Sequence, residues 1–201
     1  MKRLWQKYKN RISSSHTPNV DIGWELLNRS WVCRQCEETH SGIFDLASFC
    51  PCYWNDEEIY EPNSLLRAEG DFLSEDFCVL SGEHFFIRSV LELPLIGREG
   101  RFAYGVWVSS SKSNFEFYIE RFDSGDFDET DGWFGWLSNN LKGYPDCTKL
   151  GCGVIPQRNR QRPKLILHET EHPLVREQNE GISIDRLLEI YSLNGHQILA
   201  S

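Results

Sequence analysis

The sequence predicts an α+β fold built on a mainly antiparallel β-sheet of about five or six strands, with inserted and C-terminal helices and an N-terminal cysteine-containing knuckle. Two β-rich runs, 84–94 and 102–109, flank a charged linker with two glycines, a pattern typical of an antiparallel hairpin. The second run is apolar on both faces, as in a central strand covered on both sides. Strand patterns gather mid-chain while helical patterns are inserted or appended, which favours α+β.

Length and composition suit one main domain. The chain has 201 residues, of which 40% are hydrophobic and 13% aromatic, enough for a sizeable core. We predict a basic N-terminal arm and linker over 1–30, a single domain over 31–192 with its Cys knuckle at 31–52, and a C-terminal tail over 193–201.

Charge is spread unevenly along the chain. The formal net charge is −9, but residues 1–30 carry +4 and the remainder −13. An acidic body argues against nucleic-acid binding, because phosphate contacts need positive surface. No apolar run approaches the roughly 20 residues of a membrane span, and no secretory signal follows the basic start. We therefore expect a cytoplasmic protein with reduced thiols that does not enter membranes.

The first half of the chain contains short elements. Residues 2–12 have the apolar spacing of a short amphipathic helix, the alternative being a solvated arm. Asp56 to Glu58 indicate the exposed start of a short helix, and residues 77–80 a short strand before a turn.

The second half alternates helix and strand patterns. Phe115, Tyr118, Ile119 and Phe122 form one apolar stripe after a capping pattern at Ser113, with Gly125 as a stop. Strands are expected over 133–137, 147–157 and 164–168. A short helix should open at His172-Pro173 and close at Gly181, and a last helix should follow Ser183 and end at Asn194-Gly195.

Several motifs, in order, carry a family resemblance. They are Cys33-x-x-Cys36 with His40, Phe85–Arg88, Leu91–Pro94, Gly105–Ser109, Phe134–Leu137 with Gly143–Pro145, and His172–Leu174 with Gln178 and Gly181. Over roughly residues 31–192 the chain resembles the bacterial domain-of-unknown-function family 2199, which implies kinship without chemistry. It departs from the usual pattern at Glu37, where many relatives have Gly, and at Cys50 and Cys52.

The two cysteines at 33 and 36 form half of a zinc site. A two-residue gap lets both thiolates reach one tetrahedral ion, and His40 is close enough in sequence to contribute. Cys78, or the Cys50-Pro-Cys52 pair, would complete the site. We take Cys33, Cys36, His40 and Cys78 as the predicted zinc ligands, the alternative being plain reduced thiols.

One face of the first hairpin strand is mixed in polarity. His84, Arg88 and Glu92 share it, with Trp107 from the second strand, and we interpret these four residues as a ligand or partner face. Neighbouring members of the series lie roughly 13–14 Å apart, too far for a compact triad. The alternative is an exposed sheet face with Arg88 paired to a cross-strand carboxylate.

The other charged stretches predict no site. The acidic loop 123–131 fails the EF-hand spacing for calcium, and the basic residues from Arg158 to Lys164 are interpreted as a solvated hairpin tip. No common catalytic motif is present.

The most economical prediction is therefore a binding module for a protein or small ligand, of which an immunity-type role is one version, with a structural zinc knuckle. The competing hypothesis is a metal-dependent hydrolase that uses the Cys/His cluster.

Overall fold

The computed structural model describes residues 29–33, 35–128, 131–148, 150–168 and 170–196. The helix expected over 2–12, and the basic arm up to residue 28, lie outside these ranges. The chain divides into two compact units. We call the described parts of 1–43 and 184–201 the hairpin–helix unit, and 44–183 the sheet unit. This division differs from the single domain expected over 31–192, because the last helix groups with the cysteine knuckle.

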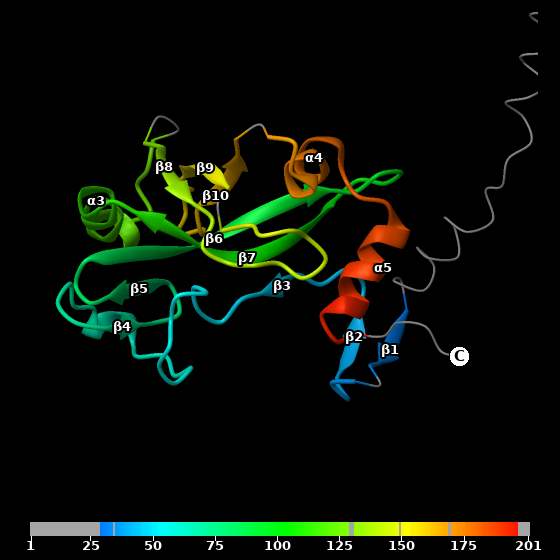
Figure 1. Cartoon of the computed structure of the whole chain (residues 1–201), viewed down its shortest axis with the longest axis horizontal. Coiled ribbons are helices and arrows are strands. Elements are labelled where there is room, and N and C mark those ends of the chain that lie inside the picture. Colours follow the sequence, from blue (N-terminus) through cyan, green and yellow to red (C-terminus); the bar gives the residue numbers. More distant parts are fainter. Residues whose placement is uncertain (1–28, 34, 129–130, 149, 169, 197–201) are drawn as a thin grey trace, which may run out of the picture. The chain divides into compact units, whose positions relative to one another are not determined.

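The hairpin–helix unit combines a short hairpin with the last helix (Figure 1). Strands β1 (Ser30–Val32) and β2 (Thr39–Ser41) pair antiparallel, with Trp31 opposite His40. Helix α5 (Ile184–Leu193) buries Ile184, Leu187, Ile190 and Tyr191. Both strands have only three residues, so this unit has little sheet of its own.

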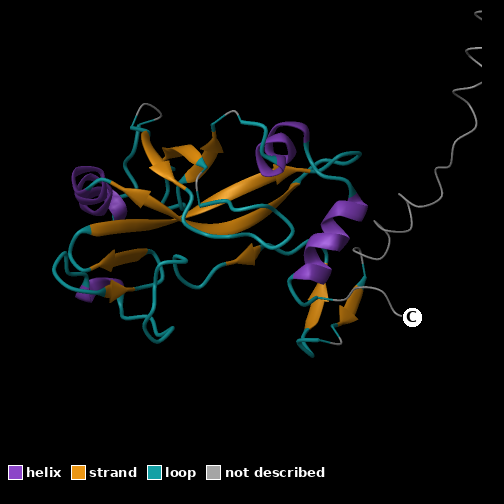
Figure 2. Ribbon diagram, in the orientation of Figure 1, coloured by secondary structure: helices purple, strands orange, loops and turns teal. Residues whose placement is uncertain are grey.

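The described part of the sheet unit holds eight strands, two α-helices and one 3₁₀ turn (Figure 2). The strands are β3 (Leu46–Ala47), β4 (Phe72–Leu73), β5 (Phe77–Leu80), β6 (His84–Pro94), β7 (Arg101–Ser110), β8 (Trp133–Trp136), β9 (Gly151–Ile155) and β10 (Lys164–Leu167). The turn η1 (Asn63–Leu65) precedes β4, and the helices are α3 (Lys112–Phe122) and α4 (Pro173–Glu180). The helix expected from Asp56 is absent from the described residues; η1 follows instead.

The sheet is mainly antiparallel, as expected, but it is mixed, and it has eight strands in the described residues rather than the expected five or six. Its order is β3-β7-β6-β10-β9-β8, with β5 also on β6 and β4 on β5. The pairs β10–β6 and β3–β7 are parallel and the others antiparallel. Strands of only two residues, such as β3 and β4, are too short to show a periodic pattern, so the sequence did not predict them. The parallel pairs join segments that lie far apart in the chain, so no local pattern predicted them.

The predicted central hairpin is confirmed. β6 and β7 pair antiparallel over ten positions from Phe85↔Ser110 to Pro94↔Arg101. Along β6 both faces are buried from Phe85 to Ser89. The even-numbered face is therefore covered around Phe86 and Arg88 rather than open along its length.

A further pairing joins β7 to the end of β8 within the sheet unit. Val108 of β7 forms an antiparallel bridge with Leu137, the residue after β8, and the Ser138 amide donates to the Trp107 carbonyl at 2.8 Å. Together with the pairs β7–β6, β6–β10, β10–β9 and β9–β8, this bridge completes a ring of pairings. Gly135 lies where a Cβ would come within 2.5 Å of the Ser109 carbonyl oxygen, so the ring needs glycine there.

The helices of the sheet unit begin and end as elementary capping rules require. α3 is capped by Ser111, whose Oγ accepts from the Asn114 amide at 3.2 Å, two residues before the expected Ser113. α4 begins as predicted, with Pro173 at its first turn and His172 Nδ1 accepting from the Leu174 amide at 3.2 Å. Phe115 of α3 packs on Phe77 and Phe85, which joins the helix to the sheet.

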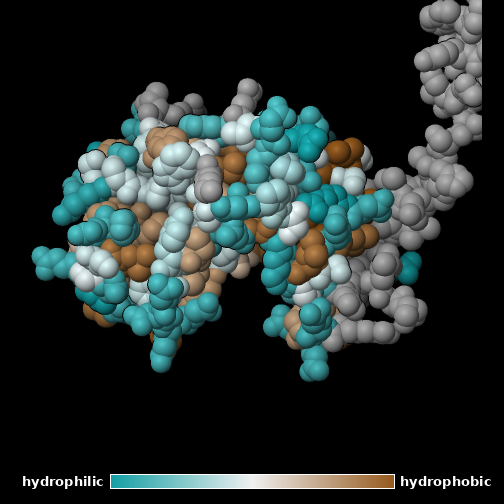
Figure 3. Space-filling view, in the orientation of Figure 1, coloured by the Kyte–Doolittle hydropathy of each residue, from teal (hydrophilic) through white to brown (hydrophobic). Residues whose placement is uncertain are grey.

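The surface of the sheet unit is mostly hydrophilic in the view of Figure 3, with apolar patches set among polar residues. In the part of the chain that the structure describes, no helix is both long and apolar enough to cross a membrane.

Candidate functional site

The Cys33–Cys36 turn is shaped by its own backbone. Cys33 directly follows β1, and its amide and carbonyl bond to the Glu38 carbonyl and the Glu37 amide, each at 2.9 Å. The Gln35 amide donates to Cys33 Sγ at 3.4 Å, and the Glu38 amide bonds to Cys36 Sγ. Glu37 adopts a left-handed φ of 61°, a conformation that favours Gly. Amides directed at sulfur stabilise thiolates, the form that binds metal.

A second histidine reaches this turn from the end of α5. Gly195 has φ of 92°, its amide donates to the Ser192 carbonyl, and the His196 amide donates to the Tyr191 carbonyl at 2.9 Å. These two bonds form a Schellman motif, in which a glycine reverses the chain after the helix. The motif therefore fixes the position of His196 relative to α5.

Four side chains converge in the hairpin–helix unit: Cys33, Cys36, His40 and His196. One ligand atom from each lies within 4.8 Å of all the others, so the group could hold a metal ion. Cys36 Sγ lies 3.1 Å from His40 Nε2 and 3.7 Å from His196 Nδ1. A tetrahedral zinc ion with ordinary bond lengths separates its ligand atoms by about 3.3–3.8 Å. The measured separations are close to that range.

Neighbouring groups and burial shift the pKa values of Cys36 and His196. The Glu38 amide favours the Cys36 thiolate, but burial and the adjacent Cys33 outweigh it and raise the pKa of Cys36. Burial, and then His40, lower the pKa of His196 and favour its neutral form. Two thiolates placed together repel each other, and a divalent cation between them would remove that repulsion.

The structure brings together three of the four residues proposed as ligands from the sequence. Cys78 is not among them: it is fully buried in β5 against Leu73, Phe86 and Trp107, and burial raises the pKa of its thiol. Of the alternative pair, Cys50 faces Glu58 at 3.9 Å. His196 takes the fourth place.

Sequence reasoning missed His196 because it lies 160 residues beyond Cys36. Its position right after the predicted helix stop at Gly195 was the available signal. A half-site with no second Cys pair calls for a search of every histidine, and one held at a helix end is already positioned.

The four residues of the predicted polar face differ in exposure and in their contacts. His84 is exposed at the start of β6, whereas Arg88 is only 8% exposed and Trp107 fully buried. Glu92 lies further along β6 and forms ion pairs with Arg101 at 2.6 Å and Lys164 at 2.9 Å.

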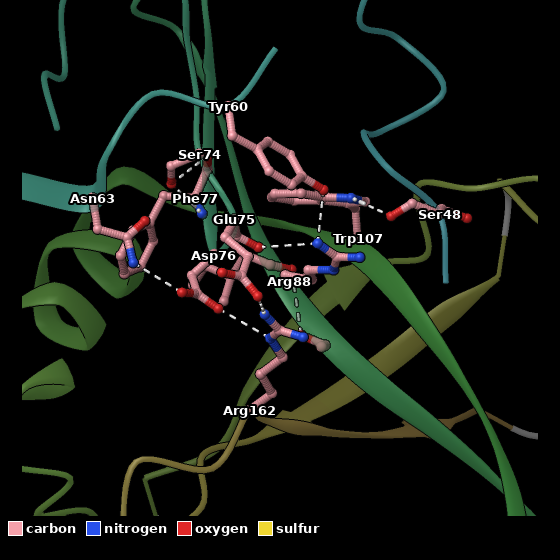
Figure 4. A network of polar contacts seen from close by, with 12 residues as sticks. Ser48, Tyr60, Asn63, Ser74, Glu75, Asp76, Phe77, Arg88, Trp107 and Arg162 are labelled. Carbon is pink, nitrogen blue, oxygen red and sulfur yellow. Dashed lines mark hydrogen bonds and ion pairs between the residues drawn. The ribbon is translucent and has the colours of Figure 1, made fainter. Parts of the chain in front are cut away.

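Arg88 lies beside the rings of Tyr60 and Trp107 (Figure 4), and it forms no ion pair with a carboxylate in the described part of the chain. Its guanidinium carbon is 5.9 Å from the Tyr60 ring centre and 5.8 Å from that of Trp107. Nη1 donates to Tyr60 Oη at 2.7 Å and to the Glu75 carbonyl at 3.3 Å. Cation–π contact and these bonds replace the cross-strand carboxylate considered from the sequence.

The carboxylates of Glu75 and Asp76 form ion pairs with Arg162 rather than with Arg88 (Figure 4). Arg162 bonds to Asp76 Oδ1 at 3.0 Å and Glu75 Oε1 at 2.9 Å. Arg158 in turn donates to the Phe127 carbonyl at 3.0 Å. The basic stretch connects the antiparallel strands β9 and β10, and its residues 158–161 are exposed, as expected of a solvated hairpin tip. Arg158 and Arg162 also make contacts within the fold.

A cavity of about 790 Å³ opens beside the start of β6 in the sheet unit. It is lined by aromatic, acidic and hydroxyl side chains. Residues relevant to its chemistry are Tyr53, Trp54, Asp56, Asp71, His84 and Trp136. Its volume is in the range of small-molecule sites. Of the predicted face, only His84 borders it.

Comparison with known proteins gives a family and no closer relative. A family model described as "Uncharacterized protein conserved in bacteria (DUF2199)" matches residues 32–182. No curated protein and no solved structure matches the chain. The matched range includes Cys33, Cys36, His40 and every residue named at the cavity, and ends before α5 and His196.

Proposed function

The chain belongs to the DUF2199 family, and we propose that it is a binding protein with two parts: a sheet unit that holds the ligand cavity, and a hairpin–helix unit stabilised by a structural zinc ion. The observation that carries the metal assignment is the convergence of four donor atoms within 4.8 Å. Two sulfur and two nitrogen donors form a set that suits zinc.

A set of four protein ligands favours a structural zinc site over a catalytic one. A catalytic zinc ion keeps one position for water, with three protein ligands. Here Cys33, Cys36, His40 and His196 supply four, which leaves no position for a hydrolytic water. This count supports a binding role over the metal-dependent hydrolase.

The binding role rests on the cavity and on charge. A chain with net charge −9 attracts basic partners, whether small cations or basic protein surfaces. An immunity-type role, in which the acidic protein neutralises a basic toxin, is one version of this proposal. Gene neighbourhood would test it, since an adjacent toxin gene is expected.

Metal analysis of purified protein tests the zinc assignment. We expect about one zinc per chain in the wild type, far less in Cys36→Ser, and an unchanged content in the control Cys52→Ser. Cys52 is also exposed but lies outside the group. A wild-type content far below one equivalent, or equal loss in both variants, would contradict the proposal.

A further inference from the structure

The cavity beside β6 is lined by two carboxylates. Asp56 and Asp71 line it, and no Lys or Arg does so among the described residues. Asp71 Oδ1 accepts from the Ser81 amide, which holds the carboxylate in place. The interior is therefore negative, with His84 as its one basic side chain in this part of the chain.

One arginine, Arg67, interacts with Asp71 but is shared with a carboxylate outside the cavity lining. Arg67 donates to the backbone carbonyl of Asp71, but its guanidinium forms two bonds with the Glu61 carboxylate, at 2.8 and 2.7 Å. Arg67 is therefore shared between the Glu61 carboxylate and Asp71, with which it also interacts electrostatically, so it offsets the Asp71 charge only in part. The Asp56 carboxylate has no Lys or Arg beside it in the described cavity lining.

Aromatic rings form another part of the wall. Tyr53, Trp54, Phe86 and Trp136 all line the cavity. The Tyr53 and Phe86 rings stack at 6.0 Å, and Trp136 is 48% exposed even though it carries a large apolar ring. The faces of aromatic rings attract cations, most strongly in Trp, and rings combined with carboxylates are the usual means of holding an alkylammonium group.

We infer that this cavity binds a small organic cation with an alkylammonium head group. The inference rests on the proposed binding function and specifies its ligand class. The rings would surround the alkyl groups, and Asp56 and Asp71 would balance the charge. The same chemistry fits a free cation or a lysine side chain of a partner protein, and the test below separates these sources.

Three probes of nearly equal shape test the charge preference: choline, the neutral 3,3-dimethylbutan-1-ol and the anionic 3,3-dimethylbutanoate. Titration calorimetry on the full chain should give choline binding at least about tenfold tighter than the alcohol, with the anion weakest. Choline binding should weaken as salt is raised. Nα-acetyl-lysine N-methylamide serves as the partner side chain: tighter binding than choline would support the cation class and assign it to a partner.

Variants test the location of the site. Asp56→Asn should weaken choline binding about tenfold, and Trp136→Leu by a similar factor. The control Glu57→Gln removes the same charge one residue along, outside the cavity lining, and should have little effect. Zinc content and circular dichroism confirm that each variant is folded.

The outcomes separate this inference from the proposed function. Equal or tighter binding of the alcohol or the anion would overturn the cation class while supporting a ligand cavity. Choline binding unaffected by Asp56→Asn and Trp136→Leu would overturn the location. Failure of every probe to bind would overturn the inference, and the zinc analysis would still test the structural half of the proposed function.

Discussion

The two units use cysteine in opposite ways. In the hairpin–helix unit, Cys33 and Cys36 lie beside two histidines, in a turn whose amides point at sulfur. In the sheet unit, Cys78 and Cys152 are fully buried, and burial raises the pKa of Cys152 to about 12. Cys33 is fully buried as well, so burial alone does not separate the two kinds of thiol. The difference is that Cys33 and Cys36 lie beside histidines, as the proposed zinc site requires. Surroundings, and not cysteine content, decide the role of each thiol.

The same contrast extends to stability. The sheet unit has a continuous aromatic and aliphatic core around β6 and β7. The described part of the hairpin–helix unit has two three-residue strands, one helix and few buried apolar side chains. Small units with little core commonly depend on a metal or disulfides. We therefore expect the two units to respond differently to the same perturbations.

Zinc removal should produce the largest difference. With zinc chelated, the amides of β1, β2 and the end of α5 should lose hydrogen-exchange protection, because zinc binding supplies much of the folding energy of small metal-stapled units. The amides of β6 and β7 should keep theirs. Mass spectrometry after exchange, with metal content measured in parallel, checks this. Unchanged protection in β1 and β2 after verified zinc loss would contradict the contrast.

Arg88→Ala should affect the sheet unit alone. It removes the side chain that contacts the Tyr60 and Trp107 rings and the bond to Tyr60 Oη, and we expect a loss of about 2–4 kcal/mol in the free energy of unfolding. Denaturant unfolding measures the loss, and zinc content should not change. The exposed control Lys142→Ala should cost less than about 0.5 kcal/mol. A similar cost for both would show that the buried cation contributes no stability.

Gly195→Ala should weaken metal binding by a smaller amount. Alanine at φ of 92° is strained, while its Cβ would meet only the Gln35 side chain at 3.5 Å. The strain of about 1–2 kcal/mol should lower zinc affinity about tenfold in a chelator competition. Gly97→Ala imposes a similar φ in the β6–β7 loop, and its zinc affinity should equal that of the wild type. An equal loss of zinc affinity in both variants would show that the Schellman motif does not contribute to metal binding.

Glu37→Gly should give the smallest effect, and in the stabilising direction. Relief of the left-handed conformation is partly offset by the entropy of glycine, so the gain in unfolding free energy should be below about 1 kcal/mol. The melting temperature of the zinc-loaded hairpin–helix unit measures it. Glu38→Gly removes the same charge at a residue without positive φ, and should destabilise. Stabilisation by Glu38→Gly alone would mean that charge, and not backbone strain, matters here.

Local features of the fold were predictable, and distant ones were not. The β6–β7 hairpin, the start of α4 at His172 and the presence of α5 all follow from periodicity and capping within a few residues. The parallel pairing of Lys164 with Val90 joins segments more than 70 residues apart and leaves no local pattern. Long-range pairing depends on global packing, which a single sequence does not display.

In the candidate site, too, the residues close together in sequence were predictable and the distant one was not. Cys33, Cys36 and His40 lie within eight residues, and their spacing alone predicted a shared ion. His196 joins them through the distant end of α5. Arg88 was placed on the correct face of β6, but its burial depends on Tyr60 and Trp107 from other segments.

X-ray absorption at the zinc edge of the purified full-length protein tests the central claim most directly, because it counts and identifies the ligand atoms. The closed Cys33, Cys36, His40 and His196 set predicts two sulfur atoms at about 2.3 Å and two imidazole nitrogens at about 2.0–2.1 Å, with no water oxygen. A first shell containing a water oxygen, or more or fewer than two sulfur atoms, would contradict the structural assignment.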